Sequence, residues 1–382
     1  MKLVQITSKN ISLGKYGSFN GSKLVGKPYG TSFEIINNEN LVPFVKEKFE
    51  DLSEDIKTTK EAPNSELNDD NTAQNLSYDD ILELKKEGLK GNKRGRDIVN
   101  EITESSDSFS KRTTFAKAKY IEKKKRKFMR VFTVLQTTAK NLCEFYFSSS
   151  SYKIGDLRID SLSQILNFAN IHAGLRVLIV DDFHGLLAGA VLERMNGQGS
   201  IFVVGDHPSS TLDKLPQFNF DKDCMNNSIS YLSWNNVDSL EDRVFSRSID
   251  LTSATEEQVQ KFEMSKAKFD ATTQKVKNNR ENLMKGDFDA LIVFSKHEPQ
   301  SIINRLSKYI YPSRPLVAFS TCREVLSSSY VSLRQSKQFV NVQLTESWIR
   351  NYQVLPGRMH PTMTTSASGG FILSAIKVLD IQ

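Results

Sequence analysis

The stretch of residues 174–199, GLRVLIVDDFHGLLAGAVLERMNGQG, decides the fold of this chain. Its apolar run at 177–180 predicts a buried strand, which meets a turn that ends at Gly185. Apolar residues at helical spacing over 186–195 then predict a helix with one buried face. A second apolar run at 201–204 predicts the next strand. Together these segments predict a β-α-β unit, the opening of a doubly wound α/β sheet.

The turn between the first strand and the helix lacks most of the glycines that a ligand-binding turn requires. In doubly wound folds this turn binds the ligand, and glycines let the backbone approach the ligand closely. Here the turn reads DDFHG over residues 181–185 and keeps only Gly185. The sequence therefore predicts the fold strongly, and it also indicates that the usual ligand site is damaged.

Two features near this turn suggest other kinds of site. Asp206 follows the second strand, where an acid can bind a ribose, but with the turn altered we expect a polar strand end. His184 lies beside Asp181 and Asp182, which invites a metal or acid–base hypothesis. Because these three side chains do not converge on one point in the sequence, we expect no metal site here.

Length and composition suggest a two-domain chain with a modestly basic charge. The chain has 382 residues and a formal net charge of +6. Its three cysteines are scattered without metal-type spacing, which argues against a disulfide framework. Met1 opens a polar segment rather than a signal peptide, and no apolar run approaches the roughly 18 residues of a membrane span. We therefore expect an intracellular chain that does not enter a membrane.

We expect a first domain over residues 1–138 that begins with a small antiparallel β-barrel or meander. Short apolar runs alternate with glycine-containing turns up to about residue 57. This module could be purely structural, or it could be a barrel that binds nucleic acid. The acidic segment at about 58–76 cannot bury enough apolar surface, so we expect a disordered insert there.

A basic helical segment is expected over residues 77–130. Ser77 followed by Asp80 predicts the start of its first helix. Gly88 and Gly91 are expected to break that helix, and a second short helix follows them.

The end of this segment, residues 111–130, is the most lopsided charge run of the chain. It contains ten basic residues against the single acid Glu122. Such a run can be a solvated helix face, but charges of one sign repel each other unless an anion faces them, and the interleaved aromatic rings can stack. The cluster KKKRK at 123–127 also resembles a nuclear-import signal. The residues that we expect to bind RNA are Lys93, Arg94, Arg96, Lys111, Arg112, Lys119, Lys123, Lys124, Lys125, Arg126, Lys127 and Arg130.

The second domain is expected over residues 139–382. After the β-α-β unit the sequence predicts three more strands and, at the end, two long strands joined by an irregular loop. Arg358 and His360 in this loop suit phosphate or a partner's acid, so we add them to the RNA-binding set, although closing the loop is an equal alternative. Five α/β strands closed by a terminal antiparallel pair is the order of the class I, Rossmann-like methyltransferase fold. The further elements are strands at 228–234, 287–295 and 315–320, and helices at 139–147, 162–171, 255–285 and 302–310.

Four blocks of the sequence carry a family resemblance. They read LGKYGSFNGSKLVGKPYGTSFEI, TTFAKAKYIEKKKRKF, LRIDSLSQILNFANIHAGLRVLIVDDFHGLLAGAVLERMNGQGSIF and LPGRMHPTMTTSASGGFILSA. The chain resembles the non-catalytic subunits of the eukaryotic tRNA (adenine-58-N1)-methyltransferase over about residues 10–378. The resemblance implies a catalytic partner subunit that shares this architecture and binds S-adenosylmethionine. It also implies a two-plus-two heterotetramer with tRNA bound across both subunit types, which we expect in the nucleus.

The resemblance implies that this chain is the inactive member of the pair. In the active subunit the first strand ends with an acid and a G-x-G-x-G turn, whose positions fall on Ile179, Asp181, Phe183 and Gly185. Three of the four are lost, since Phe183 adds bulk and Asp181 adds a carboxylate where a cofactor would bind. The active subunit also ends its fourth strand with the acid of a D-x-P motif, whereas residues 293–298 read VFSKHE here. We therefore expect no catalytic residue, no cofactor and no metal in this chain.

Two other functions stay open on the sequence. An active S-adenosylmethionine-dependent RNA methyltransferase with an unusual cofactor loop would bind the cofactor by itself. A purely structural dimerisation partner would never contact RNA, so the charges at 123–127 would not affect tRNA affinity.

Overall fold

The computed structural model describes residues 1–36, 40–45, 74–91, 93–207, 211–238, 245, 256–355 and 358–379. The chain divides into two compact units. The first comprises Met1–Gln136 with Arg350–Thr365, and the second comprises Thr137–Ile349 with Ser366–Gln382. No helix within the described ranges is long and apolar enough to cross a membrane.

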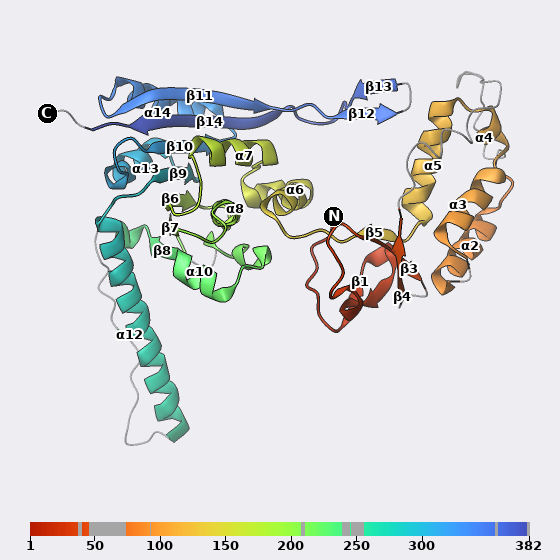
Figure 1. Cartoon of the computed structure of the whole chain (residues 1–382), viewed down its shortest axis with the longest axis horizontal. Coiled ribbons are helices and arrows are strands. Elements are labelled where there is room, and N and C mark those ends of the chain that lie inside the picture. Colours follow the sequence, from red (N-terminus) through yellow and green to blue (C-terminus); the bar gives the residue numbers. More distant parts are fainter. Residues whose placement is uncertain are drawn as a thin grey trace. The chain divides into compact units, whose positions relative to one another are not determined.

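The second unit is built on a seven-stranded sheet with the order β11-β14-β10-β9-β6-β7-β8 (Figure 1). The strands from β10 to β8 pair in parallel, whereas β14 is antiparallel to both β10 and β11. The strands are β6 (Arg176–Asp181), β7 (Ser200–Gly205), β8 (Ile229–Ser233), β9 (Ala290–Phe294), β10 (Pro315–Ser320), β11 (Phe339–Trp348) and β14 (Ser368–Lys377). This is the order of the class I methyltransferase fold, so the expected fold class is confirmed.

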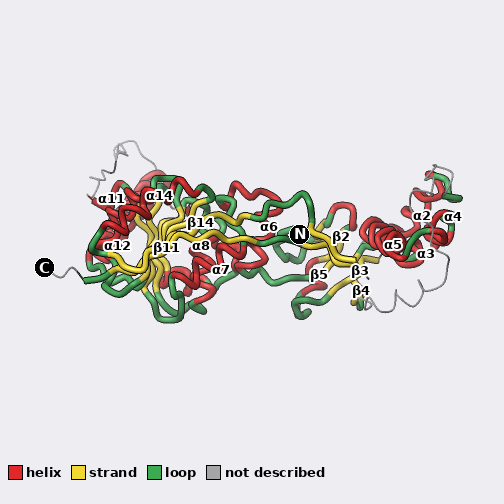
Figure 2. Tube along the Cα trace, turned by 90° about the horizontal axis from the view of Figure 1, so that it is seen from above, coloured by secondary structure: helices red, strands yellow, loops and turns green. Residues whose placement is uncertain are grey.

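Helices cover both faces of this sheet (Figure 2), which explains why its central strands are apolar without alternation. β6, β7 and β9 are buried along nearly their whole length. Their side chains join those of the helices in a core cluster that includes Leu178, Phe202, Leu291 and Leu373. The helices are α6 (Ala139–Ser150), α7 (Ile159–Phe168), α8 (Leu186–Arg194), α10 (Lys222–Ser228), α11 (Asn235–Asp238), α12 (Glu256–Met284), α13 (Pro299–Leu306) and α14 (Arg323–Gln335).

Three elements of the C-terminal part differ from expectation. The helix expected at 302–310 begins at Pro299, because Glu298 takes the N-cap position and proline suits the first turn. α14 was not predicted from the sequence, because the serines at 327–329 interrupt its apolar pattern. The loop expected between the last two long strands contains a hairpin of β12 (Tyr352–Leu355) with β13 (Arg358–Pro361).

The N-terminal module consists of two small antiparallel sheets. The strand order is β1-β2 in one sheet and β4-β3-β5 in the other. Phe19 on β2 and Phe33 on β3 both lie against Phe132 on β5, with ring centroids 5.0 and 6.0 Å away. The two sheets therefore share one hydrophobic cluster. Their strands are β1 (Asn10–Ser12), β2 (Ser18–Asn20), β3 (Ser32–Ile36), β4 (Asn40–Phe44) and β5 (Val131–Thr133).

A helical segment is inserted between β4 and β5 in the sequence. It contains α2 (Tyr78–Lys90), α3 (Gly95–Glu104), α4 (Asp107–Lys111) and α5 (Thr114–Phe128). Ser77 and Asp80 form the capping box at the start of α2 that the sequence indicates. The expectation that Gly88 breaks α2 is wrong. A Cβ on Gly88 would lie 2.7 Å from Ile98 of α3, so this glycine lets the two helices approach. α2 continues to Lys90 and ends at Gly91, its C-cap, as expected.

Most of the acidic segment expected to be disordered, residues 58–73, lies outside the described residues. Residues 74–76, the last three positions of the expected insert, pack against the link between α3 and α4. Gln74 donates to the carbonyl of Ile102 at 3.4 Å, and the Asn75 N–H donates to that of Ser105 at 3.0 Å. The start of the helical segment is therefore anchored before Ser77.

Candidate functional site

The turn after β6 is closed on itself by the carboxylate of Asp181. This side chain is fully buried at the end of the strand. It accepts hydrogen bonds from the backbone N–H groups of Phe183 (2.9 Å) and Ala188 (3.4 Å). Burial raises the pKa of Asp181 to about 7, although these hydrogen bonds oppose the rise. Two amides that could bind an outside anion near the start of α8 therefore already bind Asp181.

An aromatic stack fills the space beside this turn. The ring centroid of Phe183 lies 4.3 Å from that of Phe294, which in turn lies 5.4 Å from that of Phe319. A Cβ on Gly155 would lie only 2.8 Å from the rings of Phe183 and Phe294. The bulk of Phe183 is thus packed against the carboxyl ends of β9 and β10, the edge where open α/β sheets bind ligands.

The glycines near the turn approach the chain itself. Gly185 has a φ of +82°, and a Cβ there would lie 2.9 Å from the backbone oxygen of Thr211. A Cβ on Gly205, at the end of β7, would lie 2.7 Å from Thr211 Oγ1. Thr211 is only 3% exposed. One segment of the chain after β7 therefore occupies the room that both glycines provide.

His184 and Asp206 each pair with a residue outside the turn. His184 Nδ1 lies 2.9 Å from a carboxylate oxygen of Asp213, and Asp206 lies 3.7 Å from Nε2 of His297. Among the residues that the structure describes, no three His, Cys, Asp or Glu side chains gather in a way that could hold a metal ion. Asp206 is well exposed at the strand end, with 61% of its side chain accessible.

Asp182 places a carboxylate at the end of β9, where the local sequence shows none. Its carboxylate accepts hydrogen bonds from Ser295 Oγ and, at 3.2 Å, from the backbone N–H of Lys296. This contact could not be predicted from the sequence, because Asp182 and Ser295 are 113 residues apart. Only the parallel pairing of β6 with β9 brings them together. The carboxylate ties two strand ends to each other.

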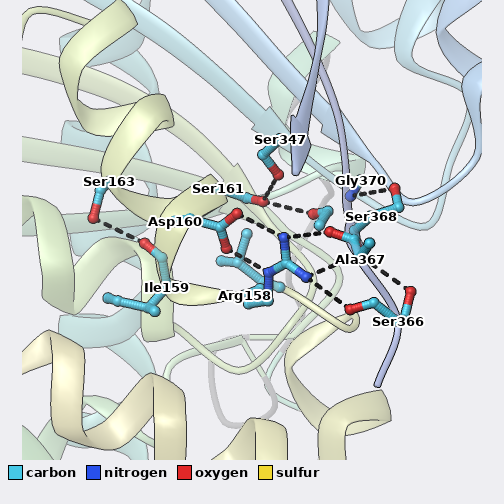
Figure 3. A network of polar contacts seen from close by, with 12 residues as sticks. Arg158, Ile159, Asp160, Ser161, Ser163, Ser347, Ser366, Ala367, Ser368 and Gly370 are labelled. Atoms are coloured by element: carbon cyan, nitrogen blue, oxygen red, sulfur yellow. Dashed lines mark hydrogen bonds and ion pairs between the residues drawn. The ribbon is translucent and has the colours of Figure 1, made fainter. Parts of the chain in front are cut away.

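A second polar network joins the start of α7 to the start of β14 (Figure 3). Arg158 forms a bidentate ion pair with Asp160, with N–O distances of 2.6 and 2.8 Å. Its guanidinium also donates to the carbonyls of Ser366, Ala367 and Ser368 at 3.3, 2.9 and 3.1 Å. Burial opposes ionisation of Asp160, but the hydrogen bonds and charge of Arg158 lower its pKa overall. One side chain therefore holds three successive carbonyls where the chain enters β14.

Ser161 extends this network. Its hydroxyl donates to the carbonyl of Gly369 at 2.6 Å and lies 2.6 Å from Ser347 Oγ on β11. A Cβ on Gly369 would lie 2.7 Å from Arg158 Nη2 and 2.8 Å from Ser161 Oγ. Glycine is required at this position because the polar network lies directly against the backbone.

The basic run forms an exposed face of α5. Lys119, Lys123, Arg126 and Lys127 are exposed and occupy positions i, i+4, i+7 and i+8, which share one side of a helix. These four residues are named the α5 basic face. Glu122, the single acid of this helix, pairs with Arg126. The face therefore keeps a net positive charge.

Arg130 and Lys93, from the expected RNA-binding set, are engaged by other groups of the protein. Arg130 is buried and donates to the carbonyls of Tyr16 (2.8 Å) and Gly88 (3.3 Å). Burial lowers the pKa of Arg130. Lys93 forms an ion pair with Glu101 at 2.8 Å. These contacts give Arg130 a packing role between the sheet module and α2, and they offset the charge of Lys93.

The other expected residues lie around α5 or elsewhere in the first unit. Arg112 and Lys124 lie over the ring of Tyr120, at 4.9 and 5.0 Å from its centroid. Lys125 is half-buried on the same helix. Arg94 and Arg96 are exposed at the start of α3, and His360 is exposed on β13. The side chains of Lys111 and Arg358 lie outside the described residues.

Comparison with known families places this chain. The family model described as Gcd10p family matches residues 1–280. The chain belongs to the Gcd10p family. A relative from Mus musculus, named tRNA (adenine(58)-N(1))-methyltransferase non-catalytic subunit TRM6, is 31% identical over 414 residues, which cover 93% of this chain and 81% of the relative.

Further relatives of this chain have the same printed name. The protein from Dictyostelium discoideum is 31% identical, covering 94% of this chain and 72% of its own length. The protein from Debaryomyces hansenii is 28% identical, covering 96% and 81%. Among solved structures, tRNA (m1A58) methyltransferase TrmI from Aquifex aeolicus is similar with a TM-score of 0.43 and 14% identity, over 66% of this chain and 80% of that one.

Replacing Asp181 with asparagine should remove a pH-dependent loss of stability. The folded pKa of about 7 lies above the value of about 3.9 for an unfolded aspartate, so the folded state holds the proton more tightly. Stability therefore falls as pH rises from about 4 to 7, by about 1.4 kcal/mol for each unit of pKa difference. Asparagine keeps an oxygen acceptor for the Phe183 amide and has no charge to bury. Thermal unfolding at several pH values should show that the unfolding midpoint of the wild type falls relative to that of D181N as pH rises. A difference between the two proteins that stays constant with pH would contradict the prediction.

Proposed function

We propose that this chain is the non-catalytic, tRNA-binding subunit of a tRNA adenine-58 N1-methyltransferase complex. The names of its Gcd10p-family relatives support the choice of complex. The observation that carries the non-catalytic role is the turn after β6, which Asp181 and Phe183 fill from within. The methyl transfer then belongs to a catalytic partner subunit, and this chain holds the substrate.

The residues of this turn do not fit S-adenosylmethionine. The methionine carboxylate would meet the carboxylate of Asp181, which already occupies the Phe183 and Ala188 amides. The ring of Phe183 and the backbone of Thr211 take the space beside the glycines. At the end of β9, Asp182 is engaged by hydrogen bonds within the chain, so it does not offer a free base. We therefore propose that the partner subunit alone binds the methyl donor.

The α5 basic face supports the RNA-binding part of the proposal. Lysine and arginine neutralise phosphates and release their counterions, so such a face binds RNA with an affinity that falls as salt rises. In the proposal these residues hold and orient the tRNA without reading its sequence. The target adenine lies inside folded tRNA, so the complex must deform its substrate to expose the base. An extended basic surface offsets that cost, which gives a physical reason to keep an inactive copy.

We further propose that the chain pairs with the catalytic subunit and that two such pairs form a heterotetramer in the nucleus. The word subunit in the relatives' names supports a partner. The two-plus-two stoichiometry follows from the family resemblance, and the nuclear location follows from that resemblance and the cluster at 123–127. Val354 and Met359 on the β12–β13 hairpin are 70% and 66% exposed, apolar surface that a partner would cover.

Reconstitution tests this function. We expect the chain alone to transfer no methyl group from labelled S-adenosylmethionine to a tRNA transcript, because it has no donor site. Adding the catalytic subunit should give product at adenine 58, and the catalytic subunit alone should give little product because it lacks half of the RNA-binding surface. Methylation by the isolated chain would contradict the proposal. Full activity of the catalytic subunit alone would also contradict the proposal, because this chain would then not be needed to bind the tRNA.

A further inference from the structure

We propose that the cavity between β3 and the start of α3 receives one unstacked nucleobase of the bound RNA. The cavity has a volume of about 210 Å³ and lies wholly within the first unit. Its walls come from β3, from the link between α2 and α3, and from the end of α5. This inference rests on the proposed RNA-binding function and adds to it a site for a base.

The lining of this cavity combines apolar surface with a hydrogen-bond acceptor. Ile36, Ile98 and Phe128 supply apolar walls, which suit the flat face of a base. Glu34 supplies a carboxylate, whose Oε1 accepts the backbone N–H of Gly95 at 3.3 Å. The charge of Arg130, which also lines the cavity, interacts with this carboxylate, but within the described residues Oε2 accepts no hydrogen bond and can accept one from a ligand. The cavity therefore matches a flat ligand that has donors along one edge.

A phosphate group would find most cations of this lining already engaged, because Lys93 is paired with Glu101 and Arg130 donates to two carbonyls, whereas Arg94 is exposed. Glu34 is a negative charge at the start of α3, and it already takes the Gly95 amide that an anion would use. Carboxylates instead accept hydrogen bonds from the amino groups of bases. Guanine presents two neighbouring N–H donors on its Watson–Crick edge, so it complements a carboxylate best. The chemistry of the cavity thus favours a base over the backbone of the same nucleotide.

Phe128 connects the cavity to the basic residues of α5. Its ring lines the cavity, and the ammonium groups of Lys124 and Lys127 lie 6.0 and 5.4 Å from the ring centroid. Arg94 also lines the cavity and is exposed. Cations close to an inserted base can bind the phosphates that flank it. An RNA strand that follows α5 can therefore place its phosphates on the cations and one base in the cavity.

Filling the cavity is the first test, on the reconstituted complex with tRNA. We expect Ile36→Trp to weaken binding by about tenfold, which is typical for the loss of one stacked base. The dependence of affinity on salt should keep its slope, because no phosphate contact is lost. Val25→Trp is the matched control, since Val25 lies in the N-terminal module, is 72% exposed and does not line the cavity. Glu34→Gln keeps an acceptor for the Gly95 amide and should also weaken binding, so it decides the matter if I36W fails to fold.

Saturation-transfer NMR with guanosine monophosphate then separates base from phosphate. The base proton of the nucleotide should show transfer from the wild-type complex, should lose it with I36W, and should keep it in excess inorganic phosphate. Displacement by inorganic phosphate would overturn the assignment to a base. Unchanged tRNA affinity of the folded I36W and E34Q complexes would overturn the cavity site while leaving RNA binding by the α5 basic face intact. Failure of the wider RNA-binding proposal gives a different result, because tRNA affinity would then stay unchanged when the cations of α5 are replaced.

Discussion

Replacing Lys119, Lys123, Arg126 and Lys127 with glutamine is expected to weaken tRNA binding by the reconstituted complex by about tenfold to a hundredfold at physiological salt. These four residues form the α5 basic face, where, among the residues that the structure describes, the four cations are opposed only by the pairing of Arg126 with Glu122. Each lost phosphate contact also reduces the slope of log affinity against log salt by about 0.7 to 0.9. Glutamine is a good helix former, so α5 itself should persist.

The matched control removes the same charge from another helix. Lys261, Lys266, Lys268 and Lys275 are exposed on α12, and changing them to glutamine lowers the net charge of the chain equally. We expect this control to change affinity and salt slope much less. Equal effects of the two sets would mean that total charge, and not the α5 basic face, attracts the RNA. If neither set had an effect, the chain would be a structural partner that does not contact RNA.

Replacing Arg158 with alanine is expected to cost about 3 to 5 kcal/mol of unfolding free energy, the usual penalty for breaking a buried ion pair. The side chains of Arg158 and Asp160 are only 13% and 11% exposed. The change leaves the carboxylate of Asp160 and three carbonyls at the start of β14 without their donor. For a unit of this size the midpoint of thermal unfolding should fall by about 10 °C.

A surface arginine provides the comparison for this variant. Arg323 is exposed at the start of α14, so Arg323→Ala should change stability by less than about 0.5 kcal/mol. Arg158→Lys is informative as well. Lysine keeps the positive charge, but it lacks the planar guanidinium that donates to three carbonyls and a carboxylate at once. We expect the lysine variant to lose most of the same stability. Wild-type unfolding temperatures for both Arg158 variants would show that the network of Figure 3 does not stabilise the fold.

The parts of the fold that depend on local pattern were predicted from the sequence. The apolar runs that became β6 and β7 are buried on both faces, which is the arrangement that continuous apolar strands indicate. The sequence also predicts that the turn at 181–185 does not bind a cofactor, and this stays a prediction. α14 was not predicted, because its serine-rich sequence has no clear apolar pattern and its helix is stabilised by packing against the sheet.

The details of the site depend on contacts between distant segments, and these could not be predicted. Asp182 meets Ser295 only because β6 pairs with β9. Arg130 entered the expected RNA-binding set because its charge is visible in the sequence, whereas its burial against Gly88 is not. No local sequence pattern predicts the cavity between β3 and the start of α3, because its walls come from three separate segments.

Calorimetric titration of S-adenosylmethionine into this chain alone, and then into its complex with the catalytic subunit, tests the central claim most directly. We expect no binding heat from the chain alone, because Asp181 and Phe183 occupy the turn that would bind the cofactor. We expect one site for each heterodimer in the complex. Binding by the isolated chain at micromolar affinity, or two sites for each heterodimer, would contradict the account and make the turn at 181–185 a working cofactor loop.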